Sequence, residues 1–126
     1  MILTTANAVR GMVPVFGVAS VARSVAWYRD VLGFSFETFG SPTDPTFAQF
    51  CRDGVEFMLQ KHDTPRPVDR HGGWDAYLRV NDVHAFLEQV RITVPNAGSI
   101  VATEYGCQEF VVVDPDGYVI RIGECT

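Results

Sequence analysis

Few residues of this 126-residue chain have the types and spacing of a catalytic site. The three histidines, His62, His71 and His84, show neither the HxH nor the HExxH spacing of metal-binding sequences. His84 lies beside the apolar stripe of a predicted helix, where we expect it to face solvent. No GxSxG nucleophile motif, phosphate-binding loop or glycine-rich dinucleotide turn occurs. The motifs therefore identify no reaction class.

The three cysteines are Cys51, Cys107 and Cys125, an odd number without a CxxC pair. This pattern argues against a disulfide framework and against a cysteine-based zinc site. We predict free, mostly structural thiols.

Aromatic side chains are the more promising feature, with nine Phe, four Tyr and two Trp. Most must belong to the core of a small protein. Trp74, however, opens a predicted strand directly after two glycines, and Tyr105 opens another. Because strand ends border cavity mouths, and aromatic walls suit planar ligands, we expect Trp74 and Tyr105 to contact a ligand.

Two short amphipathic helices are predicted. Val21, Val25, Tyr28 and Leu32 share one helical face, preceded by a capping Ser20 and ended by Gly33. A second apolar face follows Asn81 or Asp82 as the cap, and it consists of Val83, Phe86, Leu87 and Val90.

Strands surround each helix in the same order. Residues 13–19 and 74–80 precede the helices as strands. The strands predicted after the helices are 34–39, 46–51 and 55–61 in the first half and 99–104, 109–113 and 118–123 in the second. Asp53-Gly54 and the DPDG of residues 114–117 supply hairpin turns.

The halves repeat one another. Residues 47–54 (FAQFCRDG) match 110–117 (FVVVDPDG) at an offset of 63, and the helix faces match at an offset of 62. We expect the two units to pack together as one domain over residues 1–126. Module 1 spans about 13–61, a connecting loop 63–73, and module 2 about 74–124.

Charge and hydropathy restrict the possible partners. A formal charge of −5 argues against nucleic acid, which requires a basic surface. No apolar run is long enough to span a bilayer, and the N-terminus does not resemble a signal peptide. We therefore expect a cytoplasmic protein that does not bind membranes.

Three stretches resemble the vicinal oxygen chelate superfamily, which includes glyoxalase I, extradiol dioxygenases and bleomycin-resistance proteins. They are residues 13–34, 74–90 and 105–124, which include LGF at 32–34 and DPDG at 114–117. These two segments are individually common, but their order and spacing are specific. The resemblance implies an α+β fold in which two βαβββ modules form a curled mixed sheet around a central cavity. Many members are homodimers, so a homodimer is expected.

The superfamily is named for a metal held by His, Gln or Glu on the first and last strands of each module. Carried over by the helix and DPDG positions, these sites correspond to Val13, Met58, Asp75 and Arg121. Hard divalent cations need converging oxygen or imidazole donors, and a guanidinium accepts no bond. We therefore predict no metal and no other cofactor, and we expect an Asp75–Arg121 ion pair instead.

The favoured hypothesis is a metal-independent binding protein for a small molecule, possibly an antibiotic, resembling the bleomycin-resistance proteins. The alternatives are a glyoxalase-type lyase, isomerase, transferase or dioxygenase-related enzyme using the same cavity, and a domain that binds a protein partner there. No catalytic residue is assigned. The predicted ligand-binding residues are Phe57, Met58, Trp74, Asp75, Tyr105, Phe110 and Arg121.

Overall fold

The computed structural model describes residues 5–64 and 73–126. Most of the predicted connecting loop, including His71, lies outside these residues. In the described part, no helix is long and apolar enough to cross a membrane.

Both predicted helices form, with the predicted caps. Helix α1 spans Val21–Leu32, and the Ser20 side chain accepts a hydrogen bond from the Arg23 amide. Gly33 ends α1 with a φ of 73°, a left-handed conformation that glycine adopts without strain. Helix α2 spans Val83–Thr93, and Asp82, one of the two predicted caps, accepts from the Ala85 amide.

The strands form two four-stranded mixed sheets, each with one parallel pair. One sheet has the order β1-β4-β3-β2 and the other β5-β8-β7-β6. In chain order the strands are β1 Val15–Val18, β2 Ser35–Gly40, β3 Pro45–Arg52, β4 Val55–Lys61, β5 Ala76–Arg79, β6 Val101–Ala102, β7 Cys107–Val113 and β8 Val119–Cys125. The α+β class and the paired βαβββ modules are confirmed.

The registers confirm the repeat. Val15 pairs with Met58 in the first parallel pair, and Tyr77 pairs with Arg121 in the second. These partners are related by the same offsets of 62 and 63 that relate the two halves of the sequence. The strand order is therefore the same in both modules.

The match of residues 47–54 with 110–117 does not hold along β3 and β7, because Phe110 lies in the core whereas Phe47 alternates with the core residue Ala48 and faces away from it.

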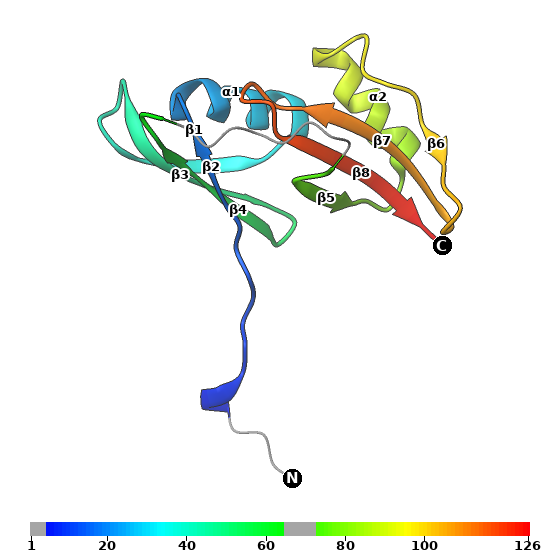
Figure 1. Cartoon of the computed structure of the whole chain (residues 1–126), viewed down its shortest axis with the longest axis horizontal. Coiled ribbons are helices and arrows are strands. Elements are labelled where there is room, and N and C mark those ends of the chain that lie inside the picture. Colours follow the sequence, from blue (N-terminus) through cyan, green and yellow to red (C-terminus); the bar gives the residue numbers. More distant parts are fainter. Residues whose placement is uncertain (1–4, 65–72) are drawn as a thin grey trace.

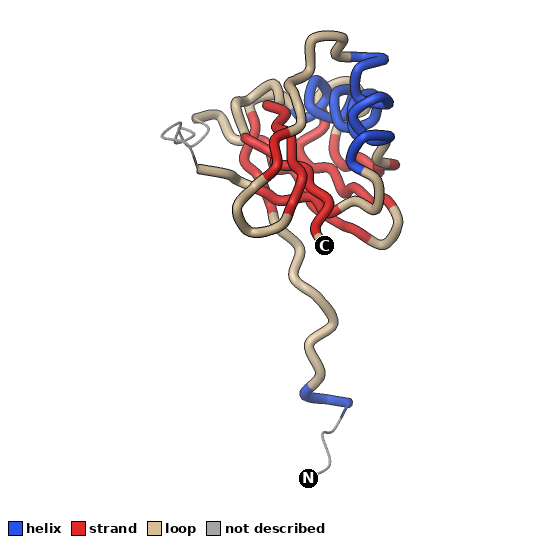
Figure 2. The backbone as a smooth tube through the Cα atoms, turned by 90° about the vertical axis from the view of Figure 1, so that its right-hand side faces the viewer, coloured by secondary structure: helices blue, strands red, loops and turns tan. Residues whose placement is uncertain are grey.

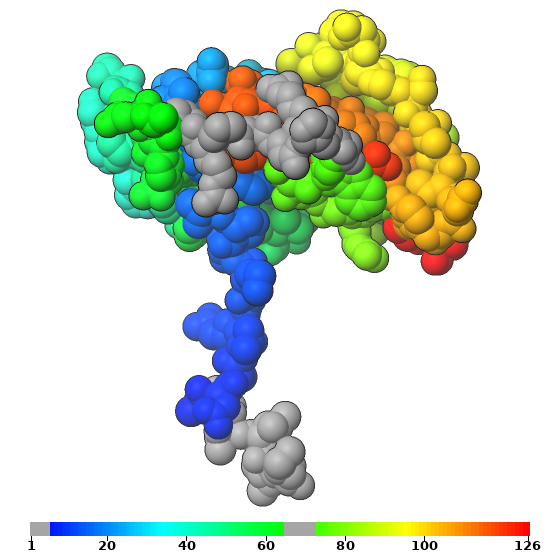
Figure 3. Space-filling view, in the orientation of Figure 1, coloured from blue at the N-terminus to red at the C-terminus, as the bar shows by residue number. Residues whose placement is uncertain are grey.

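Both helices cover the same side of the sheets, as Figures 1 and 2 show from two directions. The core lies between helices and strands and includes Tyr28, Phe50 and Leu59 in module 1 and Phe110 and Ile122 in module 2. We call the sheet face turned away from the helices the open face. The chain before β1 extends away from the body (Figure 3), with Met12 94% exposed.

Candidate functional site

The open face of the second sheet carries a buried carboxylate. Glu109, on β7, has a fully buried side chain, although an isolated buried charge would be very unfavourable. Three groups donate hydrogen bonds to it: the Tyr77 hydroxyl at 2.5 Å, the Tyr105 hydroxyl at 2.7 and 2.8 Å, and Arg121 Nη1 at 2.7 Å. These donors come from β5, the β6–β7 turn and β8, so the carboxylate ties together most of the module.

Arg121 connects this cluster to an exposed aromatic ring. Its guanidinium carbon lies 4.4 Å from the centre of the Trp74 ring, a cation–π geometry. The Tyr77 ring lies 5.5 Å from that of Trp74. Trp74 is 45% exposed and Tyr105 is 60% exposed. We call these five residues, Trp74, Tyr77, Tyr105, Glu109 and Arg121, the Glu109 cluster.

The surroundings keep Glu109 ionised. Burial alone would raise its pKa, but the hydrogen bonds from Tyr77, Arg121 and Tyr105 and the charge of Arg121 lower the pKa below its ordinary value. Burial and the bond to Glu109 raise the pKa of Tyr77 to about 12. At neutral pH Tyr77 is therefore a protonated donor and Glu109 a charged acceptor.

Gly123 leaves the space for this arrangement. It lies opposite Glu109 on β8. A Cβ at this position would collide with the Tyr77 hydroxyl and approach Glu109 Cγ to 3.1 Å. A larger residue would therefore separate Tyr77 from Glu109.

The strand register shows which residues stand beside Met58 and Arg121, the two last-strand positions named in the sequence analysis. Met58 and Arg121 stand on the last strands as predicted, but their partners on the first strands are Val15 and Tyr77. Val13 and Asp75, the first-strand positions expected from the sequence, lie two residues before these partners.

This residue set does not fit a divalent metal ion. Val15 and Met58 offer no hard donor, and Arg121 offers a positive charge. Glu109 is the nearest carboxylate, and its oxygens already accept bonds from three donors. Among residues 5–64 and 73–126, no group of three His, Cys, Asp or Glu side chains converges on one point.

The predicted Asp75–Arg121 ion pair is wrong. Asp75 precedes β5 and its carboxylate accepts a hydrogen bond from the Val119 amide at 2.8 Å. Arg121 pairs with Glu109 instead, because residues 109 and 121 share the open face of adjacent strands.

The other predicted ligand-binding residues are divided between the two faces. Met58 lies on the open face of the first sheet, level with Val15. Phe57 and Phe110 are buried and point toward the helices, in the core. Phe57 also lines an apolar hollow of about 270 Å³ between the modules, together with Phe16, Tyr77 and Leu78. The structure thus brings Trp74, Tyr105 and Arg121 together and separates them from the remaining predicted residues.

The prediction of three free cysteines is wrong in one respect. Cys107 and Cys125 form a disulfide, whereas Cys51 is free and exposed. The two paired residues are widely separated in sequence but stand directly opposite each other on β7 and β8. Cys125 Sγ lies 3.5 Å from the Tyr77 hydroxyl, so the disulfide adjoins the Glu109 cluster.

Glu109 and Tyr77 are the site residues that sequence reasoning missed. The available signal was Glu109, an acidic residue two positions before Val111 in an apolar strand. The other strand of the predicted hairpin contains Gly123, which leaves space for it. An acid at such a position is expected to need buried donors, and Tyr77 and Arg121 were the candidates on neighbouring strands.

With the geometry established, comparison with known proteins identifies the family. Residues 12–122 match the Glyoxalase/Bleomycin resistance protein/Dioxygenase superfamily, and the chain belongs to it. No curated protein matches the sequence.

Several solved structures share the fold. A glyoxalase-related enzyme from Clostridium phytofermentans is 17% identical with a TM-score of 0.78, covering 98% of this chain and 100% of that one. A bleomycin-binding protein complexed with bleomycin is 20% identical with a TM-score of 0.71, covering 94% and 100%. TioX from Micromonospora sp. ML1 is 20% identical with a TM-score of 0.68, covering 92% and 96%. These likenesses define the fold.

Proposed function

We propose that this protein binds a small organic molecule on the open face of β5, β8 and β7, at the Glu109 cluster, without a metal ion. The observation that carries the proposal is Arg121. It stands where the resemblance to the superfamily implies a chelating residue, and it bonds to buried Glu109 and stacks on Trp74. A site so arranged offers aromatic surface and hydrogen bonds rather than metal coordination.

The ligand is expected to be planar and to carry a hydrogen-bond acceptor. Trp74, which contacts Arg121, and Tyr105, which shares Glu109 with it, have exposed rings, and rings of this kind stack on flat heterocycles. Arg121 Nε is buried and has no hydrogen-bond partner in the described structure. A ligand that lay beside Trp74 could place a hydrogen-bond acceptor against Arg121 Nε and satisfy this donor.

A planar antibiotic is the ligand class that these features support best. One protein of the same fold is complexed with bleomycin, and that precedent is extended here to the class of ligand only. The chain's net charge of −5 would also attract a ligand with a cationic portion.

Fluorescence provides the test, because the chain contains only Trp27 and Trp74. In a Trp27→Phe variant, Trp74 is the sole indole reporter. Bleomycin and a panel of planar heterocyclic antibiotics would be titrated in the presence of EDTA. We expect at least one compound to quench Trp74 saturably, and Arg121→Leu to weaken that binding about tenfold or more.

Two results would overturn the proposal. One is that no compound quenches Trp74. The other is that quenching appears only after EDTA is replaced by a divalent metal.

The open faces also support a homodimer. They present exposed apolar side chains to solvent, among them Val15 at 50% and Phe39 at 43% on the first sheet and the aromatic rings of the Glu109 cluster on the second. A second copy of the chain would cover these surfaces and enclose the ligand. Light scattering of the purified protein should give twice the chain mass, and Val15→Glu should shift it toward the monomer. A wild-type protein that is monomeric at high concentration would contradict this.

A further inference from the structure

The two modules meet at two equivalent junctions, and only one of them is closed. At each junction the β-hairpin turn of one module faces the first turn of the other module's helix. The Asp114–Gly117 turn faces α1, and the turn at Asp53-Gly54 faces α2. The offsets of the repeat relate Asp116 to Asp53, and the start of α1 to the start of α2.

A carboxylate closes the first junction. Asp116 has a buried side chain and accepts hydrogen bonds from the Ala19 amide, Arg23 Nη2 and the Ser24 hydroxyl, each at 3.1 Å. The hairpin of module 2 is thereby attached to the start of α1.

The second junction has lost these donors. Ala85 and Phe86 stand where Arg23 and Ser24 stand in module 1, so neither a guanidinium nor a hydroxyl is available. Asp53 does not point into this junction: its side chain is 89% exposed and lies 3.4 Å from Arg52 Nε. A cleft of about 470 Å³ remains between the modules.

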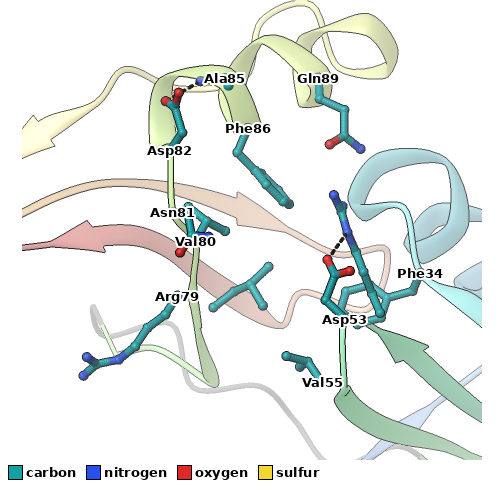
Figure 4. Close-up of a pocket in the computed structure, with 12 residues that line it drawn as sticks. Phe34, Asp53, Val55, Arg79, Val80, Asn81, Asp82, Ala85, Phe86 and Gln89 are labelled. Atoms are coloured by element: carbon teal, nitrogen blue, oxygen red, sulfur yellow. Dashed lines mark hydrogen bonds and ion pairs between the residues drawn. The ribbon is translucent and has the colours of Figure 1, made fainter.

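The cleft has an apolar wall and a basic end at Arg52, and its lining also includes Arg79 and the carboxylates Asp53 and Asp82. Figure 4 shows Phe86 and Gln89 extending from α2 toward the space, with Val55 and Asp53 across it. Leu78 and Val80 complete the apolar wall.

Arg52 supplies the basic end of the cleft. Its Nη1 donates to the Leu32 carbonyl oxygen at 2.6 Å, and its guanidinium carbon lies 5.1 Å from the centre of the Phe86 ring. These contacts fix the guanidinium while its Nη2 group keeps donors for another acceptor. The Gln89 amide stands near it, since both approach Gly33.

We propose that this cleft is a second ligand site, which binds a small organic acid with an aromatic or aliphatic body. The carboxylate of the ligand pairs with Arg52 and Gln89, and its body lies against Phe86 and Val80. The ligand thus supplies at the open junction the carboxylate that Asp116 supplies at the closed one. The site is separate from the Glu109 cluster, and neither proposal depends on the other.

The experiment uses 2-naphthoate as the probe and 2-naphthamide as its uncharged counterpart, each titrated into ¹⁵N-labelled full-length protein. We expect saturable shifts of the Val80, Phe86 and Gln89 amide signals with naphthoate, and binding about tenfold weaker with naphthamide. Arg52→Gln should weaken naphthoate binding to a similar extent. Asp53→Asn should strengthen it severalfold, because it removes a competing carboxylate from Arg52.

Asp53→Asn keeps the test decisive even if Arg52→Gln disturbs the end of α1, because Asp53 is exposed. Arg121→Leu is the control and should leave the cleft shifts unchanged. Equal binding of naphthamide would overturn the assignment of an acid. No saturable binding, or binding lost in Arg121→Leu but kept in Arg52→Gln, would overturn the site.

Discussion

The Glu109 carboxylate depends on its three donors, because its side chain is withdrawn from water. Removing one partner of such a pair leaves a charge without compensation, which costs more than the pair itself contributes. Arg121 is 26% exposed, and the two tyrosine hydroxyls would remain. We therefore expect Arg121→Leu to lower the free energy of unfolding by about 2 kcal/mol.

A double-mutant cycle distinguishes Glu109 from Asp75 as the partner of Arg121. The effects of Glu109→Gln and Arg121→Leu on the free energy of unfolding should be strongly non-additive, since the residues are in contact. The effects of Asp75→Asn and Arg121→Leu should add within about 0.5 kcal/mol. Urea denaturation measures both cycles. Coupling in the second cycle but not in the first would contradict the structure and support the Asp75–Arg121 ion pair that the sequence predicted.

Glu109 also predicts a pH dependence with a definite sign. Its pKa is lower in the folded chain than in the unfolded chain, so the unfolded chain binds more protons in acid. Its contribution to stability is therefore complete above the unfolded pKa of about 4.3 and is lost as the pH falls through the folded pKa.

The measurement compares wild type with Glu109→Gln by urea denaturation from about pH 7 to about pH 3. The stability advantage of wild type should shrink toward acid. Asp114 must be kept unchanged in both proteins, because burial raises its pKa and its contribution has the opposite sign. An advantage that grows toward acid would contradict the account.

At this scale the sequence identified Trp74, Tyr105 and Arg121, which do lie together, but not Glu109. Motif spacing places residues along a strand, whereas the partner of a buried charge is decided across strands. Asp75 lies two residues before Tyr77, the register partner of Arg121, because β5 begins later than the apolar pattern suggested. That small shift replaced a carboxylate by the Tyr77 hydroxyl as the neighbour of Arg121.

Among the secondary-structure elements, the hairpin of β7 and β8 attaches the second module to the start of α1. Its turn carries Asp116, which receives three hydrogen bonds from the start of α1. Asp116→Ala should lower the free energy of unfolding by about 2 kcal/mol. This is less than roughly 1 kcal/mol for each of the three lost bonds, because the bonds from Ala19 and Arg23 are exposed. Thermal or urea denaturation gives the value.

The repeat provides a matched control for this change. Asp53→Asn alters the equivalent turn, where the side chain is 89% exposed and Asn tolerates the left-handed φ of 51°, and it should change the free energy by less than about 0.5 kcal/mol. Equal effects of the two substitutions would show that the junctions do not differ as described.

The disulfide at the open end of the same hairpin yields a further prediction. Cys107 and Cys125 are separated by 18 residues, and closing a loop of that size stabilises a chain by about 3 kcal/mol. The double variant Cys107→Ser/Cys125→Ser should lose about this amount relative to the oxidised protein, and Cys51→Ser should lose little. Thiol titration of the air-oxidised, unfolded chain should find one free cysteine, whereas three would show that the disulfide does not form.

The oxidation state of Cys107 and Cys125 is also relevant to the cellular location of the protein. In the cytoplasm, where we expected this protein from its sequence, thiols are generally kept reduced.

The helices were predicted with their caps, because Ser20, Gly33 and Asp82 act through local geometry. The edge strand β6 is only Val101–Ala102, far shorter than the six residues predicted. The disulfide was missed for a similar reason, since it depends on the pairing of β7 with β8 rather than on cysteine spacing.

For the whole molecule, the repeat was the decisive signal. Matching hairpins and helix faces at offsets of 62 and 63 predicted paired βαβββ modules, and the structure and the family match confirm them. The difference between the two junctions was not predictable, because it arises when similar turns meet different side chains. The cleft beside Arg52 is the result of that asymmetry.

The chain has the fold of the Glyoxalase/Bleomycin resistance protein/Dioxygenase superfamily, and the central proposal is that its site binds a ligand without a metal. Calorimetric titration of the metal-stripped protein with Mn²⁺, Ni²⁺ and Zn²⁺ tests it most directly. We predict no stoichiometric binding at micromolar concentrations. One metal ion bound per chain with micromolar affinity, and lost in Glu109→Gln, would contradict the claim and favour a glyoxalase-type enzyme.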